Sequence, residues 1–459
     1  MTYSRRQLFQ IAATLAAGST MRGAEVTKRD MIVKSARPYD VEMPMSGFQH
    51  YLTPIENFYV RSHHYTPTVD LASWKLTIEG EVNKTVSLTM DDLKKLPKVE
   101  AVAVCECAGN GRGLFDPSMP GLQWGYGSVG NAKWTGVRLI DVLKLAGVKP
   151  SAIELLQDGV DVPIGTMPKF QRALPIKRAM DPNTMLAYEM NGQPIPIPHG
   201  FPLRMVVPGW ATDSWTKWLT KITALDKEFQ GFFMKTAYRY PLKLSPPGVA
   251  VPADQMRPVQ SLRVKSVIAA PLTGGQVSVG KPVTISGAAW TGDDGPVTAL
   301  DVSTDGGRTW KPATFGPEHS QFGWRLWHAS WTPAHEGYFN VMARARTAKD
   351  IQPFSQEWNQ SGYQNNKVHQ IGLEAVTGEP KAGTPEGQPP AVAPSSMPAS
   401  VRSSCLPCHG SDVMEQQRLT KAQWDKEVEK MKGWGAVVKP EDKSAIVDYL
   451  TSKWGYRPR

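Results

Sequence analysis

The sequence predicts an α+β protein made of three folded parts in series. Residues 40–250 mix short strands with a few helices, residues 255–375 alternate between strands and turns, and residues 401–459 form a small helical unit. A chain of 459 residues, 41% of them hydrophobic, has room for two to four globular domains. Its apolar runs are all shorter than the ~20 residues needed to cross a bilayer.

The net charge of the chain leaves several kinds of partner open. A charge of +10 favours attraction of small anions or of an acidic partner protein, and it is equally typical of a solvated basic surface. The sequence contains no basic tract or recognition motif that would support nucleic-acid binding. Charge alone therefore does not select a function.

Residues 1–24 have the pattern of an export signal. Arg5 and Arg6 precede a short, weakly apolar stretch from Leu8 to Ala17, which is typical of the twin-arginine pathway. A plain amphipathic helix is the structural alternative. Because this pathway carries proteins that are already folded, often around a cofactor, we expect a periplasmic protein with an inserted cofactor.

Periodicity predicts the elements of the first two folded parts. Residues 90–96 (MDDLKKL) and 139–146 (LIDVLKLA) have the 3.6-residue period of helices. Beyond residue 255, alternating strands flank Asp305-Gly306-Gly307, which is a hairpin signal, and WRLWHASWTP and GYFNVMARARTA follow as further strands. This pattern predicts a β-sandwich of immunoglobulin type over residues 255–375.

The C-terminal unit contains the most specific motif. Residues 405–409 read C-L-P-C-H, the C-x-x-C-H attachment sequence of c-type haem. Cys405 and Cys408 would bond the haem vinyl groups, and His409 would be an axial ligand of the iron. A redox pair or a zinc site is the alternative, but the adjacent histidine and the lack of further ligands argue against both.

Two methionines are candidates for the sixth haem ligand. Met414 follows His409 by five residues, so we expect it on the same helix and on the same side of the haem. Met431 lies on a later helix that begins with a T-x-x-Q capping box at residues 420–423. We favour Met431, although its apolar helix face also suits a core methionine. A Met/His ligand pair raises the haem potential.

Residues 377–400 are rich in Pro and Gly and contain no aromatic residue, which predicts a linker. A flexible coil of this length spans roughly 25–30 Å. We therefore expect the haem unit to approach the rest of the protein without a fixed dock.

The other two cysteines occur in the stretch V-A-V-C-E-C-A-G-N-G-R-G, residues 102–113. In a strand, Cys105 and Cys107 point to one face and Glu106 to the other. A disulfide between residues two apart is strained, so a structural bridge is disfavoured. One thiolate bound to a soft metal, with the other cysteine packed beside it, is one interpretation. Two buried, unreactive thiols are the other.

Several segments resemble the sulfite oxidase family of molybdenum enzymes. CAGNGRG, residues 107–113, is similar to the family's Cys-Ala-Gly-Asn signature, whose cysteine ligates molybdenum beside a pterin dithiolene. The strand-rich part, with DVSTDGGRTW and WRLW, resembles the family's dimerisation domain. The resemblance covers residues 40–372 and implies a molybdopterin-binding domain over residues 40–250. Further matching segments are FYVRSHH (58–64), AMDPNTMLAYEMNGQPIPIPHGFPLRMVVPG (179–209) and WTKW (215–218).

The resemblance also implies roles for individual residues. Cys107 would ligate molybdenum, Arg61 would supply positive charge to the substrate oxyanion pocket, and His63 would lie near the pterin. Arginine and lysine suit a pterin phosphate, and a carboxylate and an imidazole suit the edge of the pterin ring. The residues expected to hold the cofactor are Asp161, His199, Arg204, Trp215 and Lys217.

Two features of the implied active site differ or stay open. The family has an active-site tyrosine, for which Tyr238 is the candidate and Tyr240 its rival. Animal and plant members have an arginine after W-N-x, whereas this chain reads WNQSGY at residues 358–363. Arg61 would then bind the anion largely alone, with Arg112 as a weaker candidate.

The resemblance and the haem motif together predict a sulfite dehydrogenase. Sulfite would be oxidised to sulfate at molybdenum, and electrons would pass one at a time through haem c to an external acceptor such as a soluble cytochrome c. The family also implies a homodimer. Alternatives are action on another substrate, as in the related sulfane dehydrogenases, nitrate reductases and sulfoxide reductases, or a haem electron carrier without enzymatic activity.

Overall fold

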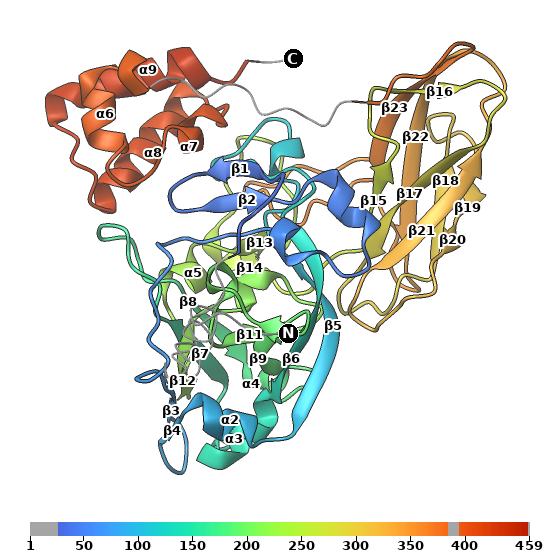
Figure 1. Ribbon diagram of the computed structural model, residues 1–459. Coiled ribbons are helices and arrows are strands. Elements are labelled where there is room, and N and C mark those ends of the chain that lie inside the picture. Colours follow the sequence, from blue (N-terminus) through green and yellow to red (C-terminus); the bar gives the residue numbers. More distant parts are fainter. Residues whose placement is uncertain (1–25, 384–393, 458–459) are drawn as a thin grey trace, which may run out of the picture.

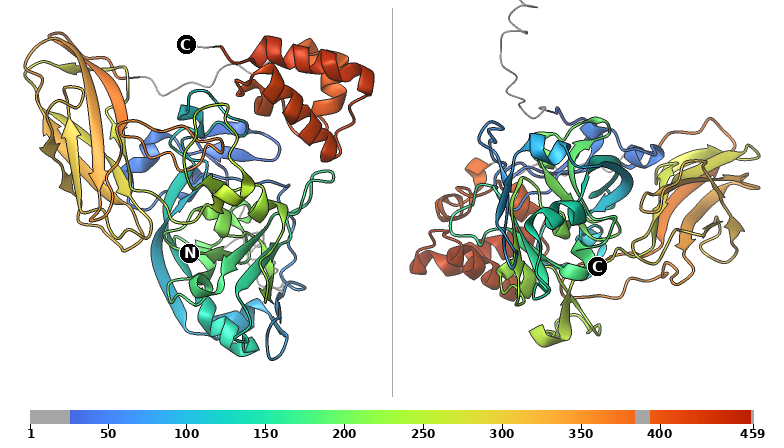
Figure 2. Two further views of the ribbon diagram at one scale, coloured as in Figure 1. Left: turned by 180° about the vertical axis from the view of Figure 1, so that it is seen from behind. Right: turned by 90° about the horizontal axis from the view of Figure 1, so that it is seen from below.

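The computed structural model describes residues 26–383 and 394–457, and it forms three parts (Figure 1). The predicted export signal, residues 1–24, lies outside the described residues, as does the middle of the predicted linker. Figure 2 shows the β-rich part and the C-terminal helical unit on opposite sides of a central part. No helix in the described ranges is long and apolar enough to cross a membrane.

Two five-stranded sheets form the framework of the central part. One has the order β10-β9-β6-β5, with β11 also paired to β9, and the other has the order β4-β3-β12-β7-β8. Buried apolar side chains from both sheets, Trp134 and Leu155 among them, make one core. The strands are β3 (Leu76–Gly80), β4 (Val86–Leu88), β5 (Lys98–Glu106), β6 (Val129–Arg138), β7 (Glu154–Gly159), β8 (Gln171–Pro175), β9 (Met185–Met190), β10 (Gln193–Pro194), β11 (Arg204–Val206) and β12 (Leu219–Leu225).

Helices and small ribbons complete this part. The predicted helices are confirmed as α2 (Met90–Lys94), which begins at a capping box between Thr89 and Asp92, and α3 (Leu139–Ala146). Gly147 ends α3 in the left-handed region, with φ of 66°, a conformation that glycine adopts without strain. The remaining elements are β1 (Ile32–Ser35) with β2 (Asp40–Glu42), α4 (Ile176–Ala179), α5 (Phe232–Lys235), and β13 (Arg239–Pro241) with β14 (Met256–Pro258).

The β-rich part contains a four-stranded and a five-stranded sheet that share an apolar core. The predicted turn at Asp305 joins β18 to β19, and Gly306 and Gly307 there have positive φ. Strands β16 and β23 pair in parallel, whereas the other neighbours are antiparallel. The strands are β15 (Lys265–Ala270), β16 (Gly275–Ser278), β17 (Val283–Trp290), β18 (Ala299–Ser303), β19 (Lys311–Pro312), β20 (Thr314–Phe315), β21 (Arg325–Trp331), β22 (Gly337–Arg346) and β23 (His369–Val376).

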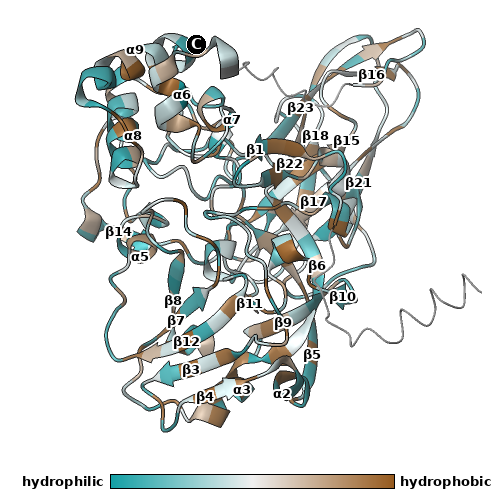
Figure 3. Cartoon of the chain, turned by 60° about the vertical axis from the view of Figure 1, so that its left-hand side comes forward, coloured by the Kyte–Doolittle hydropathy of each residue, from teal (hydrophilic) through white to brown (hydrophobic). Residues whose placement is uncertain are grey.

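The C-terminal unit is helical and has a small core of its own. Its helices are α6 (Ala399–Cys405), α7 (Asp412–Glu415), α8 (Lys421–Gly433) and α9 (Lys443–Trp454). The capping box of Thr420 and Gln423 is confirmed at the start of α8. Figure 3 shows hydrophobic and hydrophilic residues side by side along α8, as expected for a helix that packs on one face.

The helical unit is docked on the central part, so the expected approach without a fixed dock is wrong. The backbone N–H of Ala36, just after β1, donates to Asp412 of α7 at 2.6 Å, and the Tyr65 hydroxyl donates to the carbonyl of Cys408 at 2.9 Å. On the other side, the Thr166 N–H donates to the carbonyl of Trp434 at 3.0 Å. Linker composition did not predict this because the contacts join residues hundreds of positions apart.

Candidate functional site

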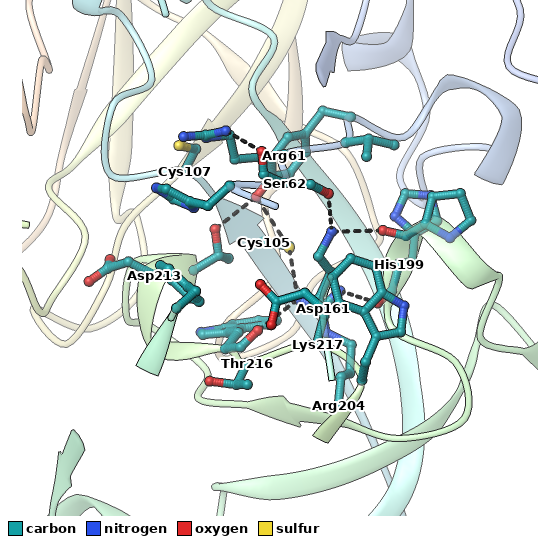
Figure 4. Close-up of a pocket in the computed structure, with 18 of the residues that line it drawn as sticks. Arg61, Ser62, Cys105, Cys107, Asp161, His199, Arg204, Asp213, Thr216 and Lys217 are labelled. Carbon is teal, nitrogen blue, oxygen red and sulfur yellow. Dashed lines mark hydrogen bonds between the residues drawn. The ribbon is translucent and has the colours of Figure 1, made fainter. Parts of the chain in front are cut away.

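A pocket in the central part collects side chains from several separate segments (Figure 4). The segments are the loop after β2, the end of β5, the loop after β7, the turns that flank β11, and the turn between α5 and β13. Every site residue predicted for the central part lines this pocket, Trp215 among them. The structure therefore brings together residues that lie up to 177 positions apart, from Arg61 to Tyr238.

The two cysteines of the C-E-C stretch face this pocket together. Strand β5 ends at Glu106, and the next residue, Cys107, donates its N–H to the carbonyl of Ser128 at 2.9 Å. Burial raises the pKa of the Cys107 thiol to about 11, against the opposing effect of the Arg61 charge. A bound metal cation would reverse this, because a coordinating thiol is deprotonated.

Cys105 lies deeper and has protein partners. Its sulfur is 3.5 Å from the Tyr59 hydroxyl and 3.9 Å from the Arg204 guanidinium. Burial raises the pKa of the Cys105 thiol as well. Cys107 alone of the two also borders the larger cavity described below. The predicted common face is confirmed, and both cysteines are free thiols.

Glu106 points away from the pocket, and its hydrogen bonds join β5 to the β-rich part. Its carboxylate accepts from Lys265 at 2.6 Å, from the Trp290 indole at 2.7 Å and from Asn110 at 2.8 Å. Both members of the Glu106–Lys265 pair are almost fully buried. The glutamate between the two cysteines thus holds the strand end and the Cys107 turn in place. A charged residue between two cysteines at the apolar end of the strand was the signal for this role, but its partner could not be read from the sequence.

Arg61 is held by a buried carboxylate that sequence reasoning missed. The Arg61 guanidinium donates to Asp40 at 3.0 Å, and the N–H of Ser62 donates to the other oxygen of Asp40 at 2.6 Å. Burial raises the pKa of Asp40 to about 6, although Arg61 opposes the rise. Burial disfavours the charge of Arg61, but Asp40, Tyr238 and Cys107 together outweigh it and raise the pKa of the guanidinium.

His63 and Tyr238 form a hydrogen-bonded pair beside Arg61. The Tyr238 hydroxyl lies 2.9 Å from Nε2 of His63, and the His63 ring stacks on Phe170. Tyr238 has a φ of 57°, a strained region for a residue with a side chain and one found often at functional sites. Its rival Tyr240 lies in β13 and does not line the pocket.

Arg112 stands on the far side of Tyr238. The segment that lacks the expected arginine, residues 358–363, lies here, and its Tyr363 stacks on Tyr238 with ring centroids 5.4 Å apart. The Arg112 guanidinium lies 4.9 Å from the centroid of the Tyr363 ring and donates to the carbonyl of Ser361 at 3.4 Å. The chain therefore supplies a second cation near Cys107 from a different segment.

Lys217 and Arg204 line the opposite end of the pocket. Lys217 donates to the Ser62 hydroxyl and to the carbonyl of Pro198, both at 2.9 Å, and burial lowers its pKa to about 7. Arg204 donates to the carbonyl of His199 at 2.9 Å, and its guanidinium lies over the Trp134 ring. Within the described ranges, neither cation has a carboxylate at ion-pair distance.

Comparison with known proteins shows which family the chain belongs to. Residues 63–233 match the oxidoreductase molybdopterin binding domain, and residues 256–376 match the Mo-co oxidoreductase dimerisation domain. The chain is 31% identical over 370 residues to sulfite oxidase of Arabidopsis thaliana, an alignment that covers 74% of this chain and 92% of that protein. The chain belongs to the sulfite oxidase family.

Two further comparisons extend this assignment. The chain is 35% identical over 356 residues to the mitochondrial sulfite oxidase of Homo sapiens, covering 74% of this chain and 65% of that protein. It thus spans just under two thirds of that relative's length. The crystal structure of the sulfane dehydrogenase SoxCD from Paracoccus pantotrophus aligns with a TM-score of 0.65 and 26% identity, covering 80% of this chain and 94% of that one.

The pocket fits the molybdopterin cofactor of the sulfite oxidase family. Nε of Arg204 and the hydroxyl of Thr216 are buried and have no hydrogen-bond partner among the described residues. Such atoms are costly unless a ligand pairs with them. Asp161, whose pKa burial raises, completes the set of donors and acceptors. Arg204, Lys217, Thr216, His199 and Asp161 would hold the pterin and its phosphate, and Cys107 is the thiol available to the metal.

A larger cavity of about 390 Å³ adjoins this pocket and continues into the C-terminal unit. Arg61, Cys107 and Tyr238 border it on the side of the molybdopterin pocket. On the other side it is bordered by the motif residues Cys405, Cys408 and His409, and by Met414 and Met431.

The motif residues around this cavity are arranged as follows. Nδ1 of His409 lies 2.8 Å from the carbonyl of Gly410, which leaves Nε2 available as a ligand atom. Met414 lies in α7, which begins after His409, so the expected common helix is wrong. Met414 belongs to the buried core of the unit, whereas Met431 near the end of α8 is only half-buried.

Proposed function

We propose that this member of the sulfite oxidase family is a sulfite dehydrogenase. It oxidises sulfite to sulfate and passes the electrons, one at a time, through a c-type haem of its own to an external acceptor such as a soluble cytochrome c. The observation that carries the proposal is the shared cavity. Cys107 and Arg61 border it from one side, and Cys405, Cys408 and His409 border it from the other.

The residues around Cys107 suit a small oxyanion substrate. Arg61 is fixed by Asp40, so its remaining N–H groups are aimed without further ordering of the side chain. The hydroxyl of Tyr238, paired with His63, supplies a neutral donor beside it. Arg112 adds a second positive charge. When bound, the molybdenum cofactor supplies the two-electron oxygen-atom chemistry that protein side chains lack.

The C-terminal unit supports the haem part of the proposal. Cys405 and Cys408 would form the thioether bonds, and His409 would ligate the iron through Nε2. We assign the sixth ligand of the haem iron to Met431. Met414 packs in the core of the unit, whereas Met431 is only half-buried at the cavity. The docked arrangement supports direct electron transfer within one chain.

The cellular setting is part of the proposal. The Arg5-Arg6 signal, residues 1–24, supports export by the twin-arginine pathway to the periplasm. This location agrees with a c-type haem motif. The match of residues 256–376 to a dimerisation domain supports a homodimer.

The test combines metal analysis with sulfite-dependent reduction of the haem. Wild-type protein is expected to contain molybdenum and haem iron, and sulfite is expected to reduce its haem band. Cys107→Ser is expected to keep the haem and to lose sulfite-dependent reduction, while Cys105→Ser serves as the neighbouring control. Full activity of Cys107→Ser would refute the proposal. Haem iron without molybdenum in well-folded wild-type protein would instead support a simple electron carrier.

A second candidate is oxidation of a sulfane-sulfur substrate. The alignment with the sulfane dehydrogenase, which covers 80% of this chain, favours keeping this alternative. Steady-state assays with sulfite and with a sulfane-sulfur substrate separate the two. A kcat/KM higher for the sulfane substrate would favour the alternative.

A further inference from the structure

Lys28, near the start of the described chain, reaches the back of the molybdopterin pocket. Its ammonium donates to the carbonyl of Ile55 at 2.7 Å and to the carbonyl of Phe58 at 2.6 Å. Its third neighbour is Nε2 of His199, at 2.8 Å. Lys28 itself is not among the pocket-lining residues, whereas His199 is, so the imidazole lies between the lysine and the pocket.

The donor and acceptor inventory fixes the proton on the His199 ring. A lysine ammonium has three N–H donors and no acceptor. Two of these donors are taken by the carbonyls of Ile55 and Phe58, and the third meets Nε2 of His199. While Lys28 is charged, Nε2 must be the unprotonated nitrogen of a neutral ring, and the proton lies on Nδ1. Burial lowers the pKa of Lys28 to about 7, so this arrangement holds below that pH, whereas a neutral amine would accept a hydrogen bond from Nε2–H.

Other observations agree with a neutral ring. His199 is 2% exposed, and burial together with the nearby charges of Lys28, Lys217 and Arg204 lowers its pKa well below the ordinary value. In the part of the chain that the structure describes, Nδ1 of His199 has no hydrogen-bond partner. An N–H donor is thus left for a ligand in the pocket.

We propose that Lys28 is a cofactor-positioning residue, which holds His199 in the Nδ1–H tautomer so that the ring donates a hydrogen bond to the molybdopterin. The lysine acts through the histidine and does not touch the cofactor. Partners of this kind behind a ligand-binding histidine usually affect ligand retention by ~10–100-fold. The inference rests on the molybdopterin site and is independent of which substrate the enzyme oxidises.

The test uses the full-length holoenzyme labelled with ¹⁵N-histidine. Ring ¹⁵N shifts report the tautomer, and the His199 signals are identified by their absence in His199→Gln. The second readout is the rate at which molybdenum is lost during dialysis. Lys28→Met removes all three donors, and Lys28→Arg keeps a group that can only donate. The matched control is Arg29→Met, which removes the same charge from an exposed neighbour.

Below pH 7, where Lys28 is charged, we expect Nε2 to be unprotonated and Nδ1 protonated in wild type and in Lys28→Arg. In Lys28→Met, we expect mixed tautomers and molybdenum loss that is about 10-fold faster, with no change in Arg29→Met. If Lys28→Met does not fold, Lys28→Gln is measured in its place with the same expectation.

The proposal is overturned if Nε2 carries the proton in wild type below pH 7, or if Lys28→Met leaves both the tautomer and the rate unchanged there. Molybdenum retained without sulfite oxidation would refute the proposed substrate and leave this inference intact.

Discussion

The two ends of the pocket differ in whether their buried positive charges have a carboxylate partner. Arg61, at the end next to Cys107, has a buried carboxylate partner in Asp40. Arg204 and Lys217, at the other end, donate to carbonyls and to a hydroxyl, and burial lowers the pKa of Lys217 to about 7. Buried cations without a counter-charge are costly.

Because of this difference, one end of the pocket suits a ligand that stays bound, and the other suits a ligand that binds and is released. The end whose cations lack an ion-paired carboxylate is suited to a cofactor phosphate that stays bound and supplies negative charge. The end with a compensated arginine stays ordered when no substrate is present, and it can accept and release an oxyanion. The comparison predicts that changes at the two ends produce different defects.

The largest effect is expected for Arg61→Met, the substrate end. Removing one charged donor from an oxyanion site typically lowers catalysis by ~10²–10³-fold. We expect a loss of this order in kcat/KM for sulfite, with the molybdenum content unchanged. Arg239→Met, an arginine outside the pocket lining, serves as the control. Loss of molybdenum from Arg61→Met would contradict the division between the two ends.

The next effect concerns the anchor of β5. Glu106→Gln keeps the shape of the side chain but leaves Lys265 buried without its counter-charge, which costs about 3 kcal/mol or more. We expect a lower midpoint of thermal unfolding. Activity should also fall because the Cys107 turn is loosened. The double change Glu106→Gln with Lys265→Met should recover part of the stability, and a double change worse than the sum of the single ones would contradict this account.

Lys217→Met tests the cofactor end. Loss of a charged hydrogen bond costs ~1.5–3 kcal/mol, so we expect roughly 10–100-fold weaker retention of molybdenum. The turnover per remaining molybdenum should be close to that of wild type. Lys221→Met, on strand β12 just after Lys217 and partly exposed, is the matched control. Normal molybdenum content combined with lost turnover would place Lys217 at the substrate end.

The smallest effect is expected for Asp40→Asn, and it depends on pH. Burial raises the pKa of Asp40 to about 6, so the carboxylate is charged above this pH and protonated below it. Protonated Asp40 resembles asparagine. We therefore expect wild-type kcat/KM to exceed that of Asp40→Asn by about 10-fold at pH 8, and the ratio to approach one below pH 6. A ratio independent of pH would show that the charge of Asp40 does not position Arg61.

The sequence predicted local motifs well and distant partners poorly. The helices around residues 90 and 139 and the capping box at Thr420 depend on residues a few positions apart. The resemblance to a family brought Cys107, Arg61 and Arg204 to one site, which periodicity alone does not do.

The residues that were missed act through long-range contacts. Asp40, Glu106 and Lys28 each make their decisive contact with a residue 21 to 171 positions away. Nothing in the local sequence marks such a partner. The docking of the helical unit was missed for the same reason, since a linker's composition describes its stiffness but not the surfaces at its ends.

The most direct test of the account is X-ray absorption at the molybdenum edge, applied to wild type, Cys107→Ser and Cys105→Ser. The account predicts that Cys107→Ser loses one sulfur from the metal's ligand shell, while Cys105→Ser keeps the wild-type shell. An unchanged shell in Cys107→Ser, or a sulfur lost only in Cys105→Ser, would contradict it.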